Sequence, residues 1–350
     1  MIRKFEVKNF TVFSHAVFSF GKKLNVIIGE NGSGKTHLIK LLYSLLRGCM
    51  KQEDSTSDML SLRDVPQAFR LNIEAAFHDK LVNMIPNKKD PATGLSVVFS
   101  FAESSPGSEI VWEWSPGIFS AKKDPMLGNE WLKNEPVFVP AHELLTIYPN
   151  FISIYDRYKV GYDSTYRNLI SLLGMPELRT LPEDFSALVN TINKKIGADI
   201  YLDAKENRFF MKEKGVGKKI GINLAAEGWR RLGILTQLIR NGSLHADVSM
   251  FWDEPEANLN PRLIRLMAEV IVDLSKLGIQ VFLATHSLFL LREIDMLVKG
   301  EKDLREGDVR YFNFLKKGKI EQGDTPEDLG EILLLDESLK QSDRYLEGDF

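Results

Sequence analysis

Residues 24–36 read LNVIIGENGSGKT, a short apolar run followed at once by a glycine-rich loop. The run Leu24–Ile28 has the length and the continuous hydrophobicity of a strand that is buried on both faces. Gly29–Thr36 then matches G-x-x-x-x-G-K-S/T, and leucines at helical spacing follow Lys35 as far as Gly48. A strand before the motif and a helix after it are the context that this pattern requires. The stretch therefore predicts a phosphate-binding loop.

The loop residues also indicate how the phosphates of ATP would be held. Glycines let backbone N–H groups converge on phosphate oxygens, and the start of the following helix adds a favourable field. We expect Lys35 to reach the β- and γ-phosphates as a catalytic residue, and the Thr36 hydroxyl to bind Mg²⁺. The residues expected to contact the nucleotide in this segment are Gly29, Asn31, Gly32, Ser33, Gly34, Lys35, Thr36 and His37.

Two later motifs each follow an apolar strand. Residues 248–255 read VSMFWDEP, so that two acids end the strand. Asp253 is expected to hold Mg²⁺, directly or through water, and Glu254 to act as the general base that polarises the attacking water. The next strand, Val281–Leu283, runs into ATHS, and its His286 would face the ligand crevice at the carboxyl edge of a parallel sheet. A neutral imidazole there could hydrogen-bond the γ-phosphate or the attacking water.

Composition limits the classes of protein that fit. Of 350 residues, 44% are hydrophobic and 27% are charged, which supports one large or two smaller domains with a proper core. No apolar run approaches the ~18–20 residues that cross a bilayer, and the N-terminus lacks signal-peptide features. The single Cys49 excludes an internal disulfide framework. We therefore expect a cytoplasmic protein without a membrane partner, and the net charge of -3 gives no global nucleic-acid signature.

The order of the predicted elements favours an α/β fold with a mostly parallel sheet. Residues 69–115 read as antiparallel strands, clearest at Val97–Phe101 and Ile110–Trp114, and residues 144–197 look largely helical with a hairpin after them. We accordingly divide the chain into an N-terminal lobe, a helical lid and a C-terminal lobe, over residues 1–143, 144–222 and 223–350.

Four segments in order, GENGSGKT, AAEGWRR, FWDEPEANLNP and ATHS, resemble the ATP-binding-cassette ATPases of the SMC/RecF class. More narrowly, the chain resembles stand-alone bacterial AAA-family ATPases that are often encoded in phage-defence or toxin–antitoxin-like loci. The resemblance covers residues 1–50 and about 222–295 well. It implies a P-loop NTPase head of the ABC type, with an antiparallel β subdomain and a helical lid insertion. Gly29–Thr36 would be Walker A, Asp253 would end Walker B, and His286 would be the switch histidine.

The resemblance also points to positions that the motifs alone leave open. The family's Q-loop aligns with VFVPAHE, which has no Gln, so His142 or Glu143 would stand in. An aromatic residue in the first strands would contact adenine, and Phe13 is the candidate. The D-loop would be EANLN, residues 256–260.

In the family that the chain resembles, AAEGWRR aligns with the signature motif, whose helix tip approaches the γ-phosphate held by a second protomer. The resemblance thus implies a head-to-tail homodimer with ATP at two composite sites. Ala226 stands where Ser is usual, so one hydroxyl contact is missing, whereas Gly228 keeps a close backbone approach. Arg230 or Arg231 could supply charge. Helices commonly open on a capping hydroxyl or carboxylate, and a poor cap is expected if the N–H groups serve a phosphate on another chain.

These features predict a Mg²⁺-dependent ATPase that dimerises on ATP and regulates an effector partner, in keeping with anti-phage defence. One alternative is a DNA repair or recombination ATPase that clamps DNA, with a basic patch around Lys194-Lys195 or Lys212 to Lys219 as its contact. Such lysine runs are more often solvated surface. The other alternative is an ATPase subunit associated with a nuclease.

Overall fold

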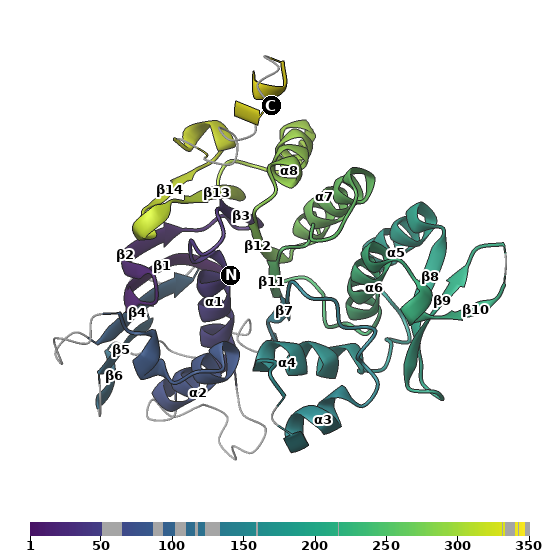
Figure 1. Ribbon diagram of the computed structural model, residues 1–350, viewed down its shortest axis with the longest axis horizontal. Coiled ribbons are helices and arrows are strands. Elements are labelled where there is room, and N and C mark those ends of the chain that lie inside the picture. Colours follow the sequence, from purple (N-terminus) through teal and green to yellow (C-terminus); the bar gives the residue numbers. More distant parts are fainter. Residues whose placement is uncertain are drawn as a thin grey trace.

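Figure 1 shows the computed structural model, in which a central sheet lies between an antiparallel β region and a group of helices. The structure describes residues 1–50, 65–86, 94–101, 110–115, 118–122, 134–158, 160–215, 217–330, 332, 340–341 and 343–346. None of the helices in these ranges combines the length and the apolar character needed to cross a membrane.

The central sheet has six strands and is parallel except at one edge. Its order is β14 (Ile320–Gly323), β13 (Val309–Phe314), β3 (Leu24–Gly29), β12 (Gln280–Thr285), β11 (Ser249–Asp253) and β7 (Val137–Val139). Only β14 pairs antiparallel to its neighbour within this sheet. Because β3, β12 and β11 run in the same direction side by side, the segments that follow their carboxyl ends meet at one edge, as the sequence predicts.

Side chains along the central strands alternate between two hydrophobic cores, as the period of a strand requires. Val26 and Trp252 point into the core that the later helices cover, whereas Ile27 and Phe251 point into the core on the other face. The strands are therefore apolar on both faces, which explains why LNVII has no polar alternation apart from the buried Asn25. Asn25 is satisfied locally, since its side chain exchanges hydrogen bonds with the backbone of Gly21.

An antiparallel sheet of five strands lies, with two helices, on the face of the central sheet that carries Ile27 and Phe251. Its order is β2 (Phe13–Ser19), β1 (Ile2–Phe10), β4 (Leu95–Phe101), β5 (Ile110–Ser115) and β6 (Ile118–Lys122). The helices are α1 (Lys35–Cys49) and α2 (Val65–Phe77), which pack against each other and share the core of this face. The predicted β subdomain and its two clearest strands are confirmed.

Helix α2 corrects one expectation, because residues 69–77 were expected to be strand. Phe69, Ile73 and Ala76 are spaced by four and three residues, and all three are buried. That spacing places them on one face of a helix, toward α1, where a β-carbon on Gly48 would lie 2.4 Å from the Phe69 ring. Burial of this helical stripe outweighs the β-preference of the individual residues.

The opposite face carries the remaining helices and a small sheet. Helices α3 (Phe151–Tyr158), α4 (Ser164–Leu173) and α5 (Glu183–Ile196) precede the antiparallel strands β8 (Ala198–Asp203), β9 (Arg208–Glu213) and β10 (Lys219–Gly221). Helices α6 (Glu227–Arg240), α7 (Pro261–Lys276) and α8 (Leu288–Gly300) follow. Short 3-10 turns occur at Leu81–Met84, which packs in the core with α1 and α2, and at Ile222–Leu224, Lys316–Gly318 and Pro326–Asp328. The expected helices and hairpin are present. That residues 144–222 act as a lid stays a prediction.

Two polar contacts join α4 to α1, the helix that follows the glycine-rich loop. Lys40 Nζ donates to Asp163 Oδ2 at 2.5 Å, and Asn168 Nδ2 donates to the Tyr43 hydroxyl at 3.0 Å. Asp163 is also the N-cap of α4, accepting from the backbone N–H of Thr165. The start of α4 is thereby fixed beside the first turns of α1.

Candidate functional site

The glycine-rich loop lies in a confined position between two neighbouring segments. Gly34 has φ +102°, and a β-carbon on it would lie 2.4 Å from Val12 Cγ2 in the β1–β2 turn. A β-carbon on Gly29 would lie 2.6 Å from the carbonyl oxygen of Phe314, at the end of β13. Only glycine fits at these two positions. The motif glycines therefore shape the loop around the start of α1, as predicted.

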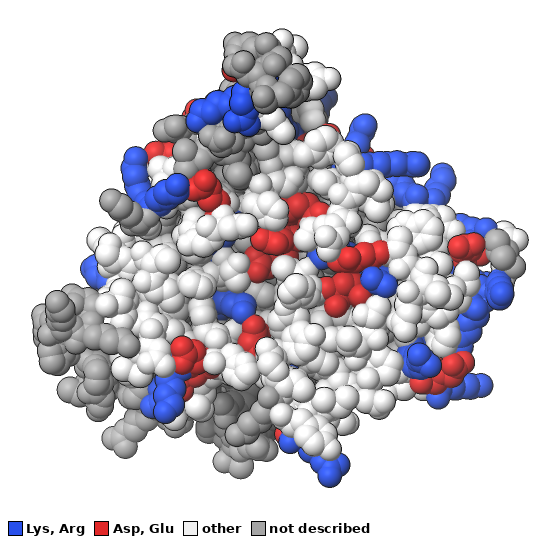
Figure 2. Space-filling view, viewed as in Figure 1, with Lys and Arg blue, Asp and Glu red and all other residues white. Residues whose placement is uncertain are grey.

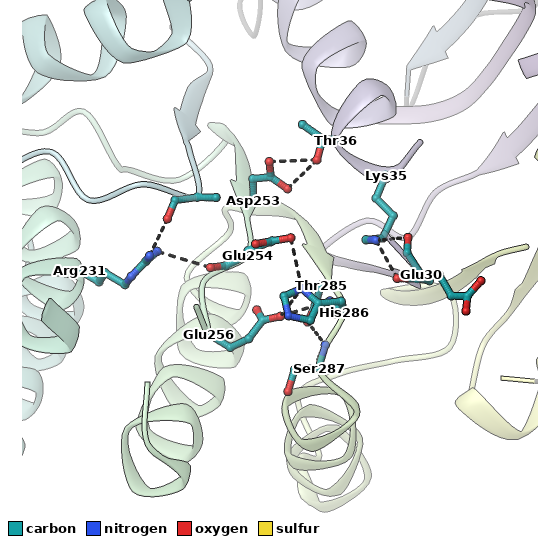
Figure 3. A network of polar contacts seen from close by, with 12 residues as sticks. Glu30, Lys35, Thr36, Arg231, Asp253, Glu254, Glu256, Thr285, His286 and Ser287 are labelled. Carbon is teal, nitrogen blue, oxygen red and sulfur yellow. Dashed lines mark hydrogen bonds and ion pairs between the residues drawn. The ribbon is translucent and has the colours of Figure 1, made fainter. Parts of the chain in front are cut away.

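The loop presents groups that suit an anionic ligand. Lys35 is buried, and its Nζ donates to the carbonyl oxygens of Gly29 and Glu30 at 2.7 and 2.8 Å (Figure 3). Burial lowers the pKa of Lys35, whereas nearby acids, first of all Glu254, act in the opposite direction. Ser33 Oγ is buried without a hydrogen-bond partner among the described residues. Gly34 is the N-cap of α1 and provides no side-chain cap, and the first turn of the helix contains no acid, so its N-terminal field is available to phosphate.

The two predicted Mg²⁺ ligands are in direct contact. Thr36 Oγ1 donates to Asp253, with both carboxylate oxygens at 3.0 Å. Burial raises the pKa of Asp253 to about 6, although the Thr36 hydrogen bond acts against this shift. A hydroxyl and a carboxylate are hard oxygen ligands of the kind that Mg²⁺ prefers, and a divalent cation would offset the burial of the charge. This donor set therefore fits Mg²⁺.

Glu254 and His286 also come together, from the ends of β11 and β12. His286 Nδ1 lies 3.2 Å from Glu254 Oε1, and both side chains are partly exposed beside the Thr36–Asp253 pair (Figure 3). The backbone of Glu254 is left-handed, with φ +47°, and its N–H donates to the Ala284 carbonyl at 2.9 Å. A left-handed non-glycine residue is costly, so the surrounding turn must impose this conformation. The arrangement can accept a proton from a water molecule and orient it.

Acidic side chains surround the site. In Figure 2 they form the centre of the visible face, over the region where β11 and β12 end. Asp253, Glu254 and Glu256 all lie near enough to Lys35 to oppose the effect of burial on its pKa. A polyphosphate would meet repulsion there unless a divalent cation accompanied it.

The start of α6 has the poor cap that the sequence predicts, and Ala226 at this tip is exposed. Gly228 has a different structural reason from the expected one. A β-carbon on it would lie 2.7 Å from both Leu259 Cδ2 and Leu263 Cδ1, so these leucine side chains pack against the glycine within the chain and would have to shift for a larger residue. That its backbone also approaches a phosphate stays a prediction.

The two arginines of α6 are engaged within the chain. Arg230 Nε lies 3.1 Å from Glu143 Oε2 in a mostly buried ion pair. Arg231 is 3% exposed, and its guanidinium donates to the carbonyl oxygens of Ala141 and Glu254 at 2.5 and 3.4 Å. In this conformation both arginines are held by their own chain, and Arg230 would have to leave Glu143, and Arg231 its buried position, to supply charge to a second chain; that either does so stays a prediction.

The segment after β7 shows which expected Q-loop substitute is available. Glu143 accepts from the backbone N–H of Leu145 and from the Thr146 hydroxyl, in addition to its contact with Arg230. Burial raises the pKa of Glu143, and Arg230 is the main opposing influence. His142 is exposed. Of the two candidates, His142 is the one whose side chain is free to face a ligand.

Phe13 does not fit its expected role in adenine binding. Its ring is 0% exposed and lies edge-on to Phe18 and Phe314, at centroid distances of 6.2 and 5.9 Å. Stacking on adenine would require this aromatic cluster to open. The adjacent Val12 is only half-buried and contacts the glycine-rich loop. The aromatic character of Phe13 reflects core packing, which the sequence pattern did not distinguish.

Two acidic residues, Glu256 and Glu227, make contacts in the site that were not predicted. Glu256 is buried and accepts hydrogen bonds from Thr285 and from the backbone of His286. Glu227 joins two predicted segments, because its carboxylate accepts from Asn258 in the turn after β11 and from Arg231. The signal in the sequence was only that several acids cluster in DEPE and AAEG, with no indication of their partners.

Comparisons with known proteins agree with this geometry. The family model described as "AAA ATPase domain" matches residues 1–136, and the model described as "AAA domain, putative AbiEii toxin, Type IV TA system" matches residues 127–292. An SMC head solved in complex with the C-winged helix domain of ScpA superposes with a TM-score of 0.52, over 93% of this chain and 98% of that one, at 14% identity. The SMC head domain from Thermotoga maritima gives a TM-score of 0.50 at 15% identity, over 93% and 98% of the two chains. The protein is a P-loop ATPase of the SMC-head fold.

Curated relatives of the ATPase include both whole-length and local matches. An "ATP/GTP phosphatase" from Helicobacter pylori is 22% identical over 348 residues, which cover 87% of this chain and 90% of the relative. The "DNA replication and repair protein RecF" from Bacillus mycoides is 46% identical over 44 residues, 13% of this chain and 12% of that protein. The predicted resemblance to the SMC/RecF class and to AAA-family ATPases is confirmed.

Proposed function

We propose that the ATPase hydrolyses ATP with Mg²⁺ at composite sites of a head-to-tail dimer, and that this cycle regulates a partner effector in anti-phage defence. The observation that carries the proposal is the meeting of Thr36, Asp253, Glu254 and His286 at one sheet edge, next to Lys35. These residues lie at or after the carboxyl ends of three neighbouring parallel strands, β3, β11 and β12, and each has the chemistry that one step needs.

Each residue of the site has a separate role in binding or hydrolysis. Lys35 leaves the loop carbonyls for the β- and γ-phosphates, which the backbone N–H groups of residues 32–36 also hold. Thr36 and Asp253 would hold Mg²⁺, which when bound neutralises phosphate charge. Glu254 accepts the hydrogen bond of the attacking water, and His286 orients that water or the γ-phosphate.

Helix α6 supports the dimer. The N-cap Ala226 is exposed and provides no side-chain cap, and Leu224, two residues before it, is 80% exposed. A large exposed apolar side chain beside unsatisfied N–H groups suits a surface that a second copy covers when nucleotide is present. Ala226, Gly228 and Arg230 would then face the γ-phosphate of the partner protomer.

The effector role rests on the comparisons. One matching family model is described as "AAA domain, putative AbiEii toxin, Type IV TA system", and the described residues include no group of three or more His, Cys, Asp or Glu side chains that could hold a metal ion. Co-purification with the product of the neighbouring open reading frame, with and without ATP, tests this role. Failure to retain that product in either state would contradict it.

A concentration series tests the composite site without any substitution. If two chains complete each site, the turnover per chain rises with protein concentration over about two decades around the dimer dissociation constant. A turnover per chain that is constant across that range, at saturating ATP, would mean that one chain suffices.

DNA clamping remains a second candidate because two observations favour it. The local match is to a DNA replication and repair protein, and Lys212, Lys214 and Lys218 are exposed on the β9–β10 hairpin. DNA should then stimulate hydrolysis with a steep salt dependence, and alanine at these three lysines should reduce that slope. Turnover that DNA does not change would exclude this candidate.

A further inference from the structure

Glu256 is a charged residue with 5% exposure, two positions after the proposed base Glu254. Its Oε1 accepts a hydrogen bond from Thr285 Oγ1 at 2.6 Å and another from the backbone N–H of His286 at 3.2 Å. Thr285 Oγ1 accepts in turn from the Ser287 N–H at 2.9 Å. These contacts link the turn after β11 to the turn after β12 (Figure 3).

The backbone holds Glu256 in place for this link. Ala257 N–H donates to the Glu254 carbonyl at 3.1 Å, and Leu259 N–H donates to the Glu256 carbonyl at 3.0 Å. Asn258, in the same turn, has φ +61°. The turn is therefore compact, and it directs the Glu256 carboxylate toward Thr285 and His286 at the end of β12 instead of toward solvent. Burial of a charge is costly unless hydrogen bonds compensate it, so such a position needs a reason.

The carboxylate lies on the same side of the His286 ring as Glu254. His286 Nδ1 is 3.2 Å from Glu254 Oε1 and 3.8 Å from Glu256 Oε1. Two carboxylate oxygens near one ring nitrogen favour the proton on that nitrogen, because a neutral imidazole has one donor and one acceptor. Nε2 is then the acceptor, and His286 is exposed enough to present it to a ligand.

We infer that Glu256 is a positioning residue for His286. It fixes the backbone of His286 directly and through Thr285, and together with Glu254 it selects the tautomer with the proton on Nδ1. The inference rests on the proposed function, since it assumes that His286 acts in hydrolysis. Glu256 itself would touch neither the nucleotide nor the attacking water, so it would not be a catalytic residue.

A double-mutant cycle tests whether Glu256 acts through His286. The variants are Glu256→Gln, His286→Ala and the two combined, each measured by single-turnover hydrolysis of radiolabelled ATP so that residual rates are detected. Glu256→Gln should lower the rate about 10–100-fold with the KM for ATP within about twofold, because the loss lies in orientation and not in binding. In the His286→Ala background, the same substitution should change the rate by less than about twofold.

Threonine variants keep the test informative if Glu256→Gln folds poorly. Thr285→Val removes the hydroxyl at nearly constant shape and should lower the rate as Glu256→Gln does. Thr285→Ser keeps the hydroxyl and should hydrolyse ATP at close to the wild-type rate. A merely structural role would lower the unfolding temperature of Thr285→Val without this rescue pattern. The tautomer of His286, read from its ¹⁵N chemical shifts by NMR, should move from Nδ1-protonated in the wild type to a mixture in Glu256→Gln.

Two results would overturn the inference. One is an equal loss from Glu256→Gln in the wild-type and His286→Ala backgrounds, which would show that Glu256 acts independently of His286. The other is a wild-type rate in both Glu256→Gln and Thr285→Val. If instead His286→Ala hydrolyses ATP like the wild type, the proposed role of His286 fails first, and the two failures remain distinct.

Discussion

The hydroxyl oxygen of Thr36 lies 3.0 Å from each carboxylate oxygen of Asp253, although 217 residues of sequence separate the two. The contact exists because β12 lies between β3 and β11 and all three strands are parallel. Thr36 lies in the first turn of α1, which follows β3 and the glycine-rich loop, and Asp253 is the last residue of β11. The fold therefore builds the proposed Mg²⁺ site from the ends of its central strands.

Thr36→Val should raise the Mg²⁺ concentration needed for half-maximal hydrolysis at least about tenfold, since it removes the hydroxyl ligand while nearly preserving the shape of the side chain. The measurement is turnover against Mg²⁺ at fixed ATP. Thr36→Ser is the matched control and should behave like the wild type. An unchanged Mg²⁺ requirement in Thr36→Val would exclude the hydroxyl as a ligand.

Asp253→Asn should stabilise the metal-free protein at neutral pH. The folded pKa of about 6 lies above the ordinary value of 3.8, so the folded state binds a proton that the unfolded state has already lost between these values. Stability from this group is therefore present below pH 3.8 and is lost as the pH rises through about 6. The loss is on the order of 2–3 kcal/mol, which Asn avoids.

Chemical unfolding at pH 5 and pH 7.5 measures this effect. The variant should exceed the wild type in free energy of unfolding more at the higher pH, and Mg²⁺ with ATP should stabilise the wild type alone. Asp303→Asn, at an exposed position, is the control and should match the wild type both in its stability at the two pH values and in its stabilisation by Mg²⁺ with ATP. A less stable Asp253→Asn at pH 7.5 would contradict the burial argument.

Lys35→Ala should abolish measurable nucleotide binding, because it removes the ammonium group that the loop holds in readiness for phosphate. Titration of a fluorescent ATP analogue measures the affinity, with an expected loss of at least about 100-fold. Lys316→Ala is a suitable comparison, since Lys316 lies near the same loop with 79% of its side chain exposed. Equal effects of the two substitutions would argue for general electrostatics and against a specific phosphate contact.

Arg230→Ala should destabilise the chain by about 1–3 kcal/mol, because Glu143 would be left buried without its cation. The double variant Glu143→Gln with Arg230→Ala should recover much of this loss in thermal unfolding. That double variant then isolates the dimer role of Arg230. Recovered stability with lost ATP-driven dimerisation would place Arg230 on the partner's nucleotide, whereas normal dimerisation would confine it to its own chain.

The centre of the fold could be predicted because its signals are local. The apolar strand before Gly29 and the helix after Lys35 give the glycine-rich motif one context, and parallel strands must bring their carboxyl ends to one edge. The contacts of Asp253 and His286 follow from that rule alone. The site was therefore largely readable from three short motifs.

The remaining parts depend on partners that are distant in sequence. Residues 69–77 were misread because the helical spacing of Phe69 and Ile73 counts only once α1 provides a surface to cover. Phe13 was misassigned because an aromatic residue near a ligand loop looks the same in sequence whether it is buried or exposed. The buried position of Glu256 was not predicted, because it depends on a hydrogen bond from Thr285, and no local pattern in the sequence identifies that partner.

Glu254→Gln tests the central claim most directly, that the carboxylate immediately after β11 is the general base for hydrolysis in a dimer closed by ATP. Turnover should fall about 10²–10⁴-fold while ATP binding is retained, because the amide cannot take up a proton. Light scattering should then show the variant accumulating as a dimer with ATP and Mg²⁺ and returning to monomer when nucleotide is removed. Wild-type turnover, or a variant that stays monomeric with ATP at every concentration, would contradict the account.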